Sequence, residues 1–354
     1  MALPMVSALR AQDPNVRIDW MCGRVVAPLL RHVEGLSEVV VVDERSMLVG
    51  SSIRKGMAVA RAWLAVAGRR YDAVYVAHSD IRYQFLTWAL RAGHTRSLNS
   101  TKRNRGIVPG RTHADEYVRL VTGLDDARAP AYPPPRLSLR LPDSLEERLQ
   151  RANPDGRPLI ALTPGGARNV ARENPLRRWP LEQYAELADS LDQEGYRVVL
   201  TGDRIDGWVR SVFWHLPVAD FIGATDLPAL AALLQRCAAI VAHDSGPLHI
   251  ARAVGTPVVA LLGPTPPSMF FRPSPYTAVL WPGGMLPCAP CYDGYDFADC
   301  SSNVCMQMID YRSVMLRLRA LVDANHRGTP PVSQLTDIVR APIERPAEQG
   351  RDRN

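Results

Sequence analysis

The segment from His243 to His249 has the residue types of an anion-binding turn. The apolar run before it (AAIVA) predicts a buried strand that ends where the polar residues begin. Ser245 suits a helix N-cap, Pro247 suits the first helical turn, and Gly246 lets the backbone approach a ligand closely. Free backbone N–H groups and the helix dipole would attract an anion there, although a capped helix with a core histidine is the structural alternative. The residues of this segment that we expect at the anion are Asp244, Ser245, Gly246 and His249.

Three further glycine-containing turns follow predicted strands in the same half of the chain, at 163–167, 201–203 and 263–265. Glycine admits a phosphate close to the backbone, and the arginines after the first turn can neutralise its charge. One such turn is weak evidence, but four at successive strand ends predict a site for a nucleotide diphosphate. The pattern G-x-G-x-x-G is absent from the start of the chain, which disfavours a dehydrogenase. The additional binding residues predicted here are Thr163, Gly165, Gly166, Arg177, Gly202 and Thr265.

Four of the six cysteines lie within 18 residues and could hold a structural metal ion. Cys288 and Cys291 have C-x₂-C spacing, and Cys300 and Cys305 have C-x₄-C spacing. Four thiolates are a typical ligand set for structural zinc. Free thiols or occasional disulfides are the alternative interpretation.

The elements that position these residues alternate along the chain. Short, nearly continuous apolar runs are typical of strands buried on both faces, and amphipathic helical runs separate them. The alternation predicts an α/β fold with parallel sheets. Strands are expected at 38–43, 72–77, 159–163, 197–201, 239–243 and 258–262, and helices at 58–67, 83–92, 114–124, 181–193, 227–236 and 248–254.

Composition and length favour two domains. A chain of 354 residues exceeds the usual size of a single core, and five prolines between 129 and 143 predict a linker there. We therefore expect one Rossmann-like domain over 1–155, which includes that linker, and a second over 156–327. The stretch 328–354, rich in Pro, Arg and Glu, is expected to be a mobile tail.

The charge pattern narrows the class of partner. The net charge is +6, and only Lys55 and Lys102 among 42 basic residues are lysines. No basic block is interleaved with aromatic residues, so a nucleic-acid partner is not expected. A modest positive charge suits a phosphate-bearing ligand or an anionic membrane surface. No run is long enough to span a bilayer and no secretory signal is evident, which predicts a cytoplasmic protein.

Several segments together resemble glycosyltransferase family 9, the lipopolysaccharide heptosyltransferases and their relatives. They are PGGAR, RRWPLEQYAELADSL, YRVVLTGD and DFIGATDLPALAALLQRCAAIVAHDSGPLHIARAVGTPVVALLGPT. The resemblance is strong over 159–267 and looser before it. It implies a GT-B architecture, in which two Rossmann-like domains face a cleft. It also implies an inverting transfer, without a metal cofactor, from a nucleotide sugar, with ADP-heptose as the expected donor. The implied acceptor is a lipopolysaccharide core glycolipid at the inner membrane face, which places the protein peripherally there.

Some positions depart from the pattern of this family. Family members usually open with a strand and a Gly-Asp turn whose Asp is a candidate base, and the first residues of this chain resemble the segment just after that turn. We therefore expect an interrupted sheet or an unpaired strand edge in the first half, and lower stability and activity than in a chain extended upstream. Arg177 stands where a Lys is usual, and Pro266 where an Asp is common. No residue is marked as the catalytic base; Asp19, Asp43 and Asp80 read as turn or strand-end residues.

The sequence thus predicts an inverting glycosyltransferase that moves a sugar, a heptose by resemblance, to a lipopolysaccharide core or related glycan. Two alternatives stay open at this point. One is a catalytically impaired relative that binds the donor alone, and the other is a nucleotide-sugar 2-epimerase of the same fold. The donor base and sugar, the acceptor and the oligomeric state do not follow from the sequence.

Overall fold

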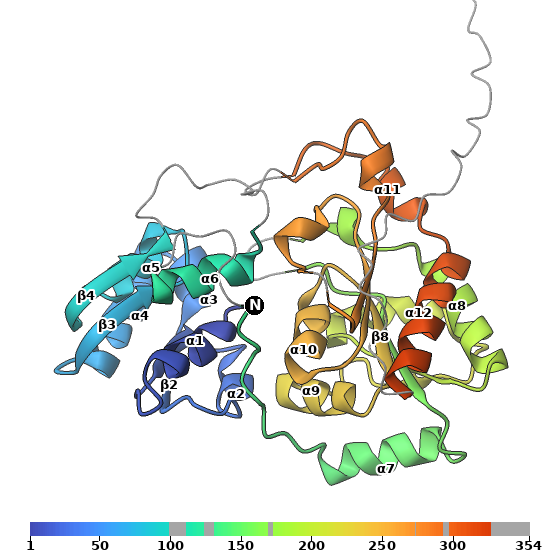
Figure 1. Ribbon diagram of the computed structural model, residues 1–354, viewed down its shortest axis with the longest axis horizontal. Helices are drawn as coiled ribbons and strands as arrows, with labels where there is room; N and C mark the ends of the chain where they lie inside the picture. Colours follow the sequence, from blue (N-terminus) through green and yellow to red (C-terminus); the bar gives the residue numbers. More distant parts are fainter. Residues whose placement is uncertain (99–110, 124–130, 169–172, 273, 293–296, 327–354) are drawn as a thin grey trace, which may run out of the picture.

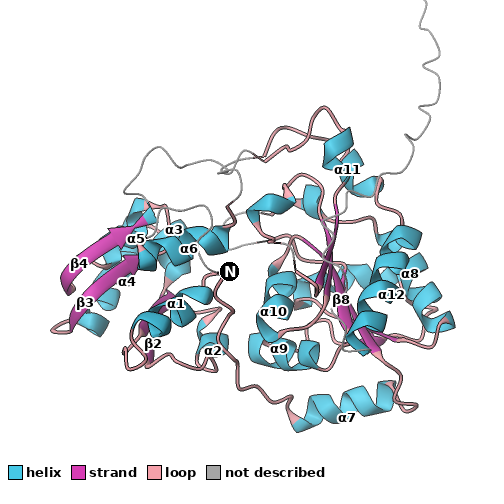
Figure 2. Cartoon of the chain, viewed as in Figure 1, coloured by secondary structure: helices cyan, strands magenta, loops and turns pink. Residues whose placement is uncertain are grey.

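The computed structural model describes residues 1–98, 111–123, 131–168, 173–272, 274–292 and 297–326, which form two lobes (Figure 1). The C-terminal lobe is built around a six-stranded parallel sheet with the strand order β10-β9-β8-β5-β6-β7. Figure 2 shows these strands enclosed by helices. The strands are β5 (Leu159–Thr163), β6 (Arg197–Leu200), β7 (Ala219–Asp220), β8 (Ala239–His243), β9 (Val258–Leu261) and β10 (Thr277–Leu280).

Helices cover both faces of this sheet, because alternate residues of each strand point to opposite sides. Ile160 and Leu162 belong to a hydrophobic cluster on one face of the sheet, with side chains of α8 (Leu181–Gln193) and α12 (Tyr311–His326). Ala161 packs in the opposite cluster with three other helices. They are α7 (Asp143–Ala152), α9 (Leu227–Gln235) and α10 (Gly246–Val254). The short helix α11 (Val304–Gln307) precedes α12.

The N-terminal lobe holds two separate pairs of parallel strands. In the described residues β1 (Asp19–Gly23) pairs with β2 (Glu38–Val42), and β3 (Arg70–Val76) pairs with β4 (Arg91–Ser97). This is the interrupted sheet that the sequence predicts. The helices of this lobe are α1 (Pro4–Gln12), α2 (Ala27–Leu30), α3 (Glu44–Val49), α4 (Ser52–Val66), α5 (Ile81–Leu86) and α6 (His113–Thr122).

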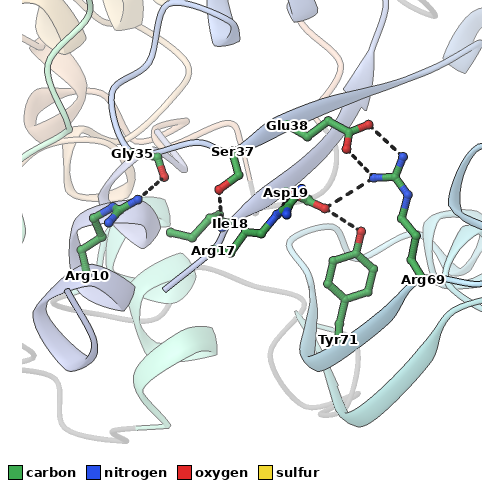
Figure 3. A network of polar contacts seen from close by, with 9 residues as sticks. All are labelled: Arg10, Arg17, Ile18, Asp19, Gly35, Ser37, Glu38, Arg69 and Tyr71. Carbon is green, nitrogen blue, oxygen red and sulfur yellow. Dashed lines mark hydrogen bonds and ion pairs between the residues drawn. The ribbon is translucent and has the colours of Figure 1, made fainter. Parts of the chain in front are cut away.

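Side chains join the two strand pairs where backbone hydrogen bonds do not. Arg69 donates two hydrogen bonds to Glu38, at 2.6 and 2.8 Å, and one to Asp19 at 3.4 Å (Figure 3). The Tyr71 hydroxyl donates to the same Asp19 carboxylate at 2.8 Å. These residues lie at the starts of β1, β2 and β3, so the join is at the N-terminal edge of the strands.

One predicted element is wrong in part. The sequence predicts a helix over 83–92, but α5 ends at Leu86 and β4 begins at Arg91. The β4 sequence RAGHTRS is polar and largely exposed, so it lacks the apolar signal of a buried strand. No predicted strand covers β1, β7 or β10, whereas 159–163, 181–193 and 239–243 coincide with β5, α8 and β8. The predicted tail over 328–354 and residues 129–130 of the predicted linker lie outside the described residues.

The two lobes contact each other at described residues. Arg272 of the C-terminal lobe lies 2.6 Å from the Asp115 carboxylate on α6. Val254, at the end of α10, packs against the cluster of Leu30, Val33 and Leu137. Between the lobes, residues 131–142 form no helix before α7 begins, as the prolines there predict.

Candidate functional site

The carboxylate of Asp244 connects three of the predicted binding residues. It follows the end of β8 and its side chain is only 9% exposed. The Thr265 hydroxyl donates to Oδ2 at 3.2 Å, and Arg177 Nη1 lies 3.3 Å from the same oxygen. His249 Nε2 lies 3.8 Å from Oδ1. Burial alone would raise the pKa of Asp244, but its interactions with His249 and Arg177 outweigh burial and lower it, so the group is ionised.

The N-terminus of α10 lies beside this carboxylate. Ser245 occupies the N-cap position, but its hydroxyl donates to the His243 carbonyl at 3.1 Å and does not bond a helix N–H. A Cβ added at Gly246 would meet no atom within 4 Å. The first backbone N–H groups of α10 therefore keep their capacity to bind an anion, and the helix dipole favours negative charge there.

The turn after β5 lies against the same helix start. Gly166 has φ +78°, and a Cβ built on it would lie 3.7 Å from the Cβ of Ser245. Its N–H donates to Asp206 Oδ1 at 2.9 Å. At Gly165 an added Cβ would lie 2.4 Å from Asp206 Cγ, so only glycine fits against that carboxylate. Two of the predicted glycine turns thus converge on one place.

Asp206 is a positioning residue that is not among the residues predicted from the sequence. Its side chain accepts from Gly166 N on one oxygen and from Asp203 N, at 2.8 Å, on the other. It is buried, with 5% of its surface exposed. Gly202 packs beside it, because a Cβ there would lie 3.1 Å from Asp206 Cβ. The available signal was the capping-box spacing of Asp203 and Asp206 after the strand.

Several buried polar atoms around Asp244 have no hydrogen-bond partner within the described part of the chain. Buried polar groups are normally satisfied, so a group of such atoms at one sheet edge indicates a ligand site. Arg178, by contrast, is occupied: it donates to the Gly166 carbonyl at 2.8 and 3.1 Å and pairs with Glu173. The atoms without a partner are Thr163 Oγ1, Arg177 Nε and His249 Nδ1.

His243 lies beneath the site as a neutral group. It is fully buried at the end of β8, and burial lowers its pKa to about 4. Its Nδ1 lies 3.3 Å from the Tyr184 hydroxyl, which also donates to the Thr163 carbonyl at 3.3 Å. Tyr184 therefore links the end of β5 to the end of β8.

The N-terminal lobe reaches the site through α6. The His113 ring centroid lies 5.4 Å from that of Phe270, which lies 5.4 Å from that of His249. Burial lowers the pKa of His113, and the charge of Asp244 acts against that shift. Neither His113 nor Phe270 is predicted from the sequence, because neither lies in one of the glycine turns.

The three aspartates considered as bases have structural roles. Asp19 holds Tyr71 and Arg69 at the opposite edge of the strands. Asp43 accepts from Ser46 N at 3.2 Å and caps α3. Asp80 accepts from Arg82 N at 2.9 Å and caps α5.

The cysteines near the C-terminal end of the sheet are free thiols in this structure. In the described ranges no three His, Cys, Asp or Glu side chains are grouped so that they could hold a metal ion. Cys291 donates instead to the Cys288 carbonyl at 3.1 Å, and burial raises the pKa of Cys305 to about 11. The geometry thus gives the zinc prediction no support, and zinc stays a prediction for elemental analysis. Gly263 packs against Cys305, since a Cβ there would lie 2.8 Å from its sulfur.

A parallel sheet that carries an arginine- and glycine-lined site at its C-terminal edge, faced by a second α/β lobe, is the GT-B architecture of glycosyltransferases. The family model described as glycosyltransferase family 9 (heptosyltransferase) matches residues 59–296, and the chain belongs to this family. Lipooligosaccharide heptosyltransferase 2 of Haemophilus influenzae is 28% identical over 293 residues, which are 75% of this chain and 80% of the relative.

Solved structures agree on the fold. A glycosyl transferase family 9 protein from Veillonella parvula superposes with a TM-score of 0.68 at 23% identity, covering 91% of this chain and 92% of that one. The E. coli heptosyltransferase WaaC, solved with ADP-2-deoxy-2-fluoro heptose, superposes with a TM-score of 0.61 at 16% identity. That match covers 90% of this chain and 94% of the other.

Proposed function

We propose that the protein transfers a heptose, with inversion, from ADP-heptose to a lipopolysaccharide core acceptor. The observation that carries the proposal is the arrangement around Asp244. Arg177, Thr265 and the uncapped start of α10 meet there beside the Gly166 turn. Backbone N–H groups and a guanidinium are suited to a diphosphate. The WaaC structure with a fluorinated ADP-heptose and the heptosyltransferase relatives favour this donor.

In the proposed reaction an acceptor hydroxyl attacks the anomeric carbon of the heptose. The new C–O bond forms on the face opposite the leaving group, the bond to the diphosphate breaks, and ADP departs with the electron pair. Arg177 and the α10 N-terminus stabilise the charge that develops on the diphosphate. Asp244 holds Arg177 and Thr265 in place, so its own role is positioning.

The hydroxyl must lose its proton as it attacks. Asp19, Asp43 and Asp80 are engaged as caps or ion-pair partners. His113 faces the donor side across Phe270 and is half-buried. Its pKa is lowered by burial, so at neutral pH the imidazole is uncharged and can accept a proton. We assign it the base role in this proposal. The acceptor, a glycolipid core, would reach the cleft from the cytoplasmic face of the inner membrane.

Donor binding tests the proposal directly. Calorimetry with ADP-heptose, and with GDP- and UDP-sugars, should give measurable affinity for the ADP-sugar alone. Ser245→Trp and His249→Ala should weaken ADP binding, whereas Ser211→Trp and His215→Ala, at exposed positions of the same lobe, should not. Unchanged affinity in both site variants, with the fold intact, would refute the site. Retained anomeric configuration in the product would refute the inverting reaction.

A further inference from the structure

Helix α4 has apolar side chains on two opposite faces. Ala58, Ala62 and Val66 are buried against the N-terminal lobe. Ile53 and Leu64 are each 76% exposed, and Met57 is 46% exposed. At about 100° per residue these three lie within about 40° of one another, on the side opposite the buried stripe. A helix that needs only one apolar face for its core therefore carries a second one in solvent.

Aromatic side chains extend this second face onto α5. The Trp63 ring centroid lies 5.1 Å from that of Trp88 and 6.2 Å from that of Phe85. Trp63 Nε1 also donates to the Phe85 carbonyl at 2.9 Å, which ties α4 to α5. Trp88 is 74% exposed and Phe85 58%. We call this surface the apolar face; it consists of Ile53, Met57, Trp63, Leu64, Phe85 and Trp88.

The charge on α4 itself has one sign. The stretch 49–67 contains Arg54, Lys55 and Arg61 and no Asp or Glu. All three basic side chains are exposed, and none has an ion-pair partner among the residues that the structure describes. Arg54 and Arg61 lie about 80–100° from Ile53 around the helix, so they border the apolar stripe.

We propose that the apolar face binds the surface of an anionic phospholipid bilayer. Exposed Trp and Leu side chains bordered by exposed cations are the composition of a helix that lies in the membrane interface. The acid-free basic stretch complements anionic headgroups. None of the described helices has the length and hydrophobicity to cross a membrane. This inference goes beyond sugar transfer and does not depend on the donor site.

Vesicle co-sedimentation with the full chain tests this surface. The protein should bind vesicles of phosphatidylglycerol and phosphatidylcholine well and vesicles of phosphatidylcholine alone weakly. Trp88→Ser should lower the partition coefficient about tenfold, because a large apolar side chain no longer enters the interface. Arg54→Gln and Arg61→Gln should each lower it about fivefold. The matched control is Trp214→Ser, since Trp214 is 84% exposed in the other lobe and should not matter.

Tryptophan quenching by brominated lipids tests the same surface in the unmodified chain. Quenching should occur with anionic vesicles and fall in Trp88→Ser but not in Trp214→Ser. Equal binding to both vesicle types, or equal loss in the two Trp variants, would overturn the proposal. So would a dimer in sedimentation experiments that Trp88→Ser dissociates without any vesicle binding, which would assign the face to a second copy. Transfer to a lipid-free acceptor fragment should be unchanged in Trp88→Ser, which separates this surface from the catalytic proposal.

Discussion

Arg177 Nη1 lies 3.3 Å from the Asp244 carboxylate, although 67 residues separate them in the chain. The Arg177 side chain is 19% exposed and that of Asp244 9%, so the pair is largely withdrawn from water. The carboxylate accepts a hydrogen bond from Nη1 of the guanidinium, whereas Arg177 Nε has no partner in the described structure. Arg177 is therefore fixed in position with a donor left for a ligand.

Removing the Arg177 charge should weaken donor binding. In Arg177→Met we expect ADP affinity to fall about 10- to 100-fold, the equivalent of one hydrogen bond to a charged group, about 1.5–3 kcal/mol. Arg177→Lys should lose less, because it keeps the charge but not the planar donor geometry. Calorimetry with ADP measures both. Arg168→Met is the control, since Arg168 pairs with Glu173; an equal loss in that variant would contradict a specific role for Arg177.

Asp206 should be a stability residue as well as a positioning one. Asp206→Ala leaves the N–H groups of Gly166 and Asp203 without their acceptor, which costs about 2–5 kcal/mol of unfolding free energy. Asp206→Asn retains one acceptor oxygen and should cost less. Urea unfolding measures both values. Asp189→Ala is the control, because Asp189 is exposed. Equal losses of unfolding free energy at the two positions would argue that Asp206 does not hold the turns of Gly166 and Asp203 together.

Burial explains which parts of the fold the sequence predicts. β5 and β8 are buried along their whole length, and their apolar runs give the bounds that the structure shows. β4 lies in an exposed pair, so its polar sequence carries no strand signal, and the predicted helix over 83–92 runs past the end of α5 into β4. The glycine turns were found because each follows a buried strand.

Long-range packing explains the contacts that the sequence does not predict. Asp206 meets Gly166 across 40 residues, and His113 reaches Phe270 from the other lobe. Neither contact is marked by a pattern of neighbouring residues in the sequence, because its two partners lie far apart in the chain. Ser245 has the backbone of the predicted N-cap, but its hydroxyl donates to the His243 carbonyl and accepts from no helix N–H.

Acid should destabilise the C-terminal lobe through His243. Its pKa is about 4 in the folded state and about 6.5 in an unfolded chain, so the unfolded state binds more protons between these values. Stability therefore rises with pH from about 4 to 6.5, by up to about 3 kcal/mol for this group. His243→Gln does not titrate and should flatten that part of the profile. Urea midpoints measured against pH test this; an identical slope in the two proteins would refute it.

The cysteine cluster gives a prediction that elemental analysis decides. A zinc ion held by Cys288, Cys291, Cys300 and Cys305 requires about one equivalent per chain. Less than about a tenth of an equivalent of zinc or iron would mean that the thiols are free, as they are in the structure. Cys288→Ser with Cys300→Ser should abolish any bound metal, whereas Cys237→Ser, at a buried thiol in another part of the lobe, should leave it unchanged.

His113 should affect the transfer rate and not donor affinity. A positioned base contributes about 10²- to 10⁴-fold, so His113→Gln should lower kcat by that factor while calorimetric ADP affinity stays within about twofold. Because the neutral imidazole accepts the proton, kcat/KM should rise with pH and level off above the His113 pKa, which burial places below its usual value. His113→Gln should lack this acidic limb. Phe270→Leu removes the ring between His113 and His249 but keeps an apolar side chain, and should leave the limb in place. If His113→Gln retained the limb at a reduced rate, His113 would only position the acceptor, and another group would take the proton.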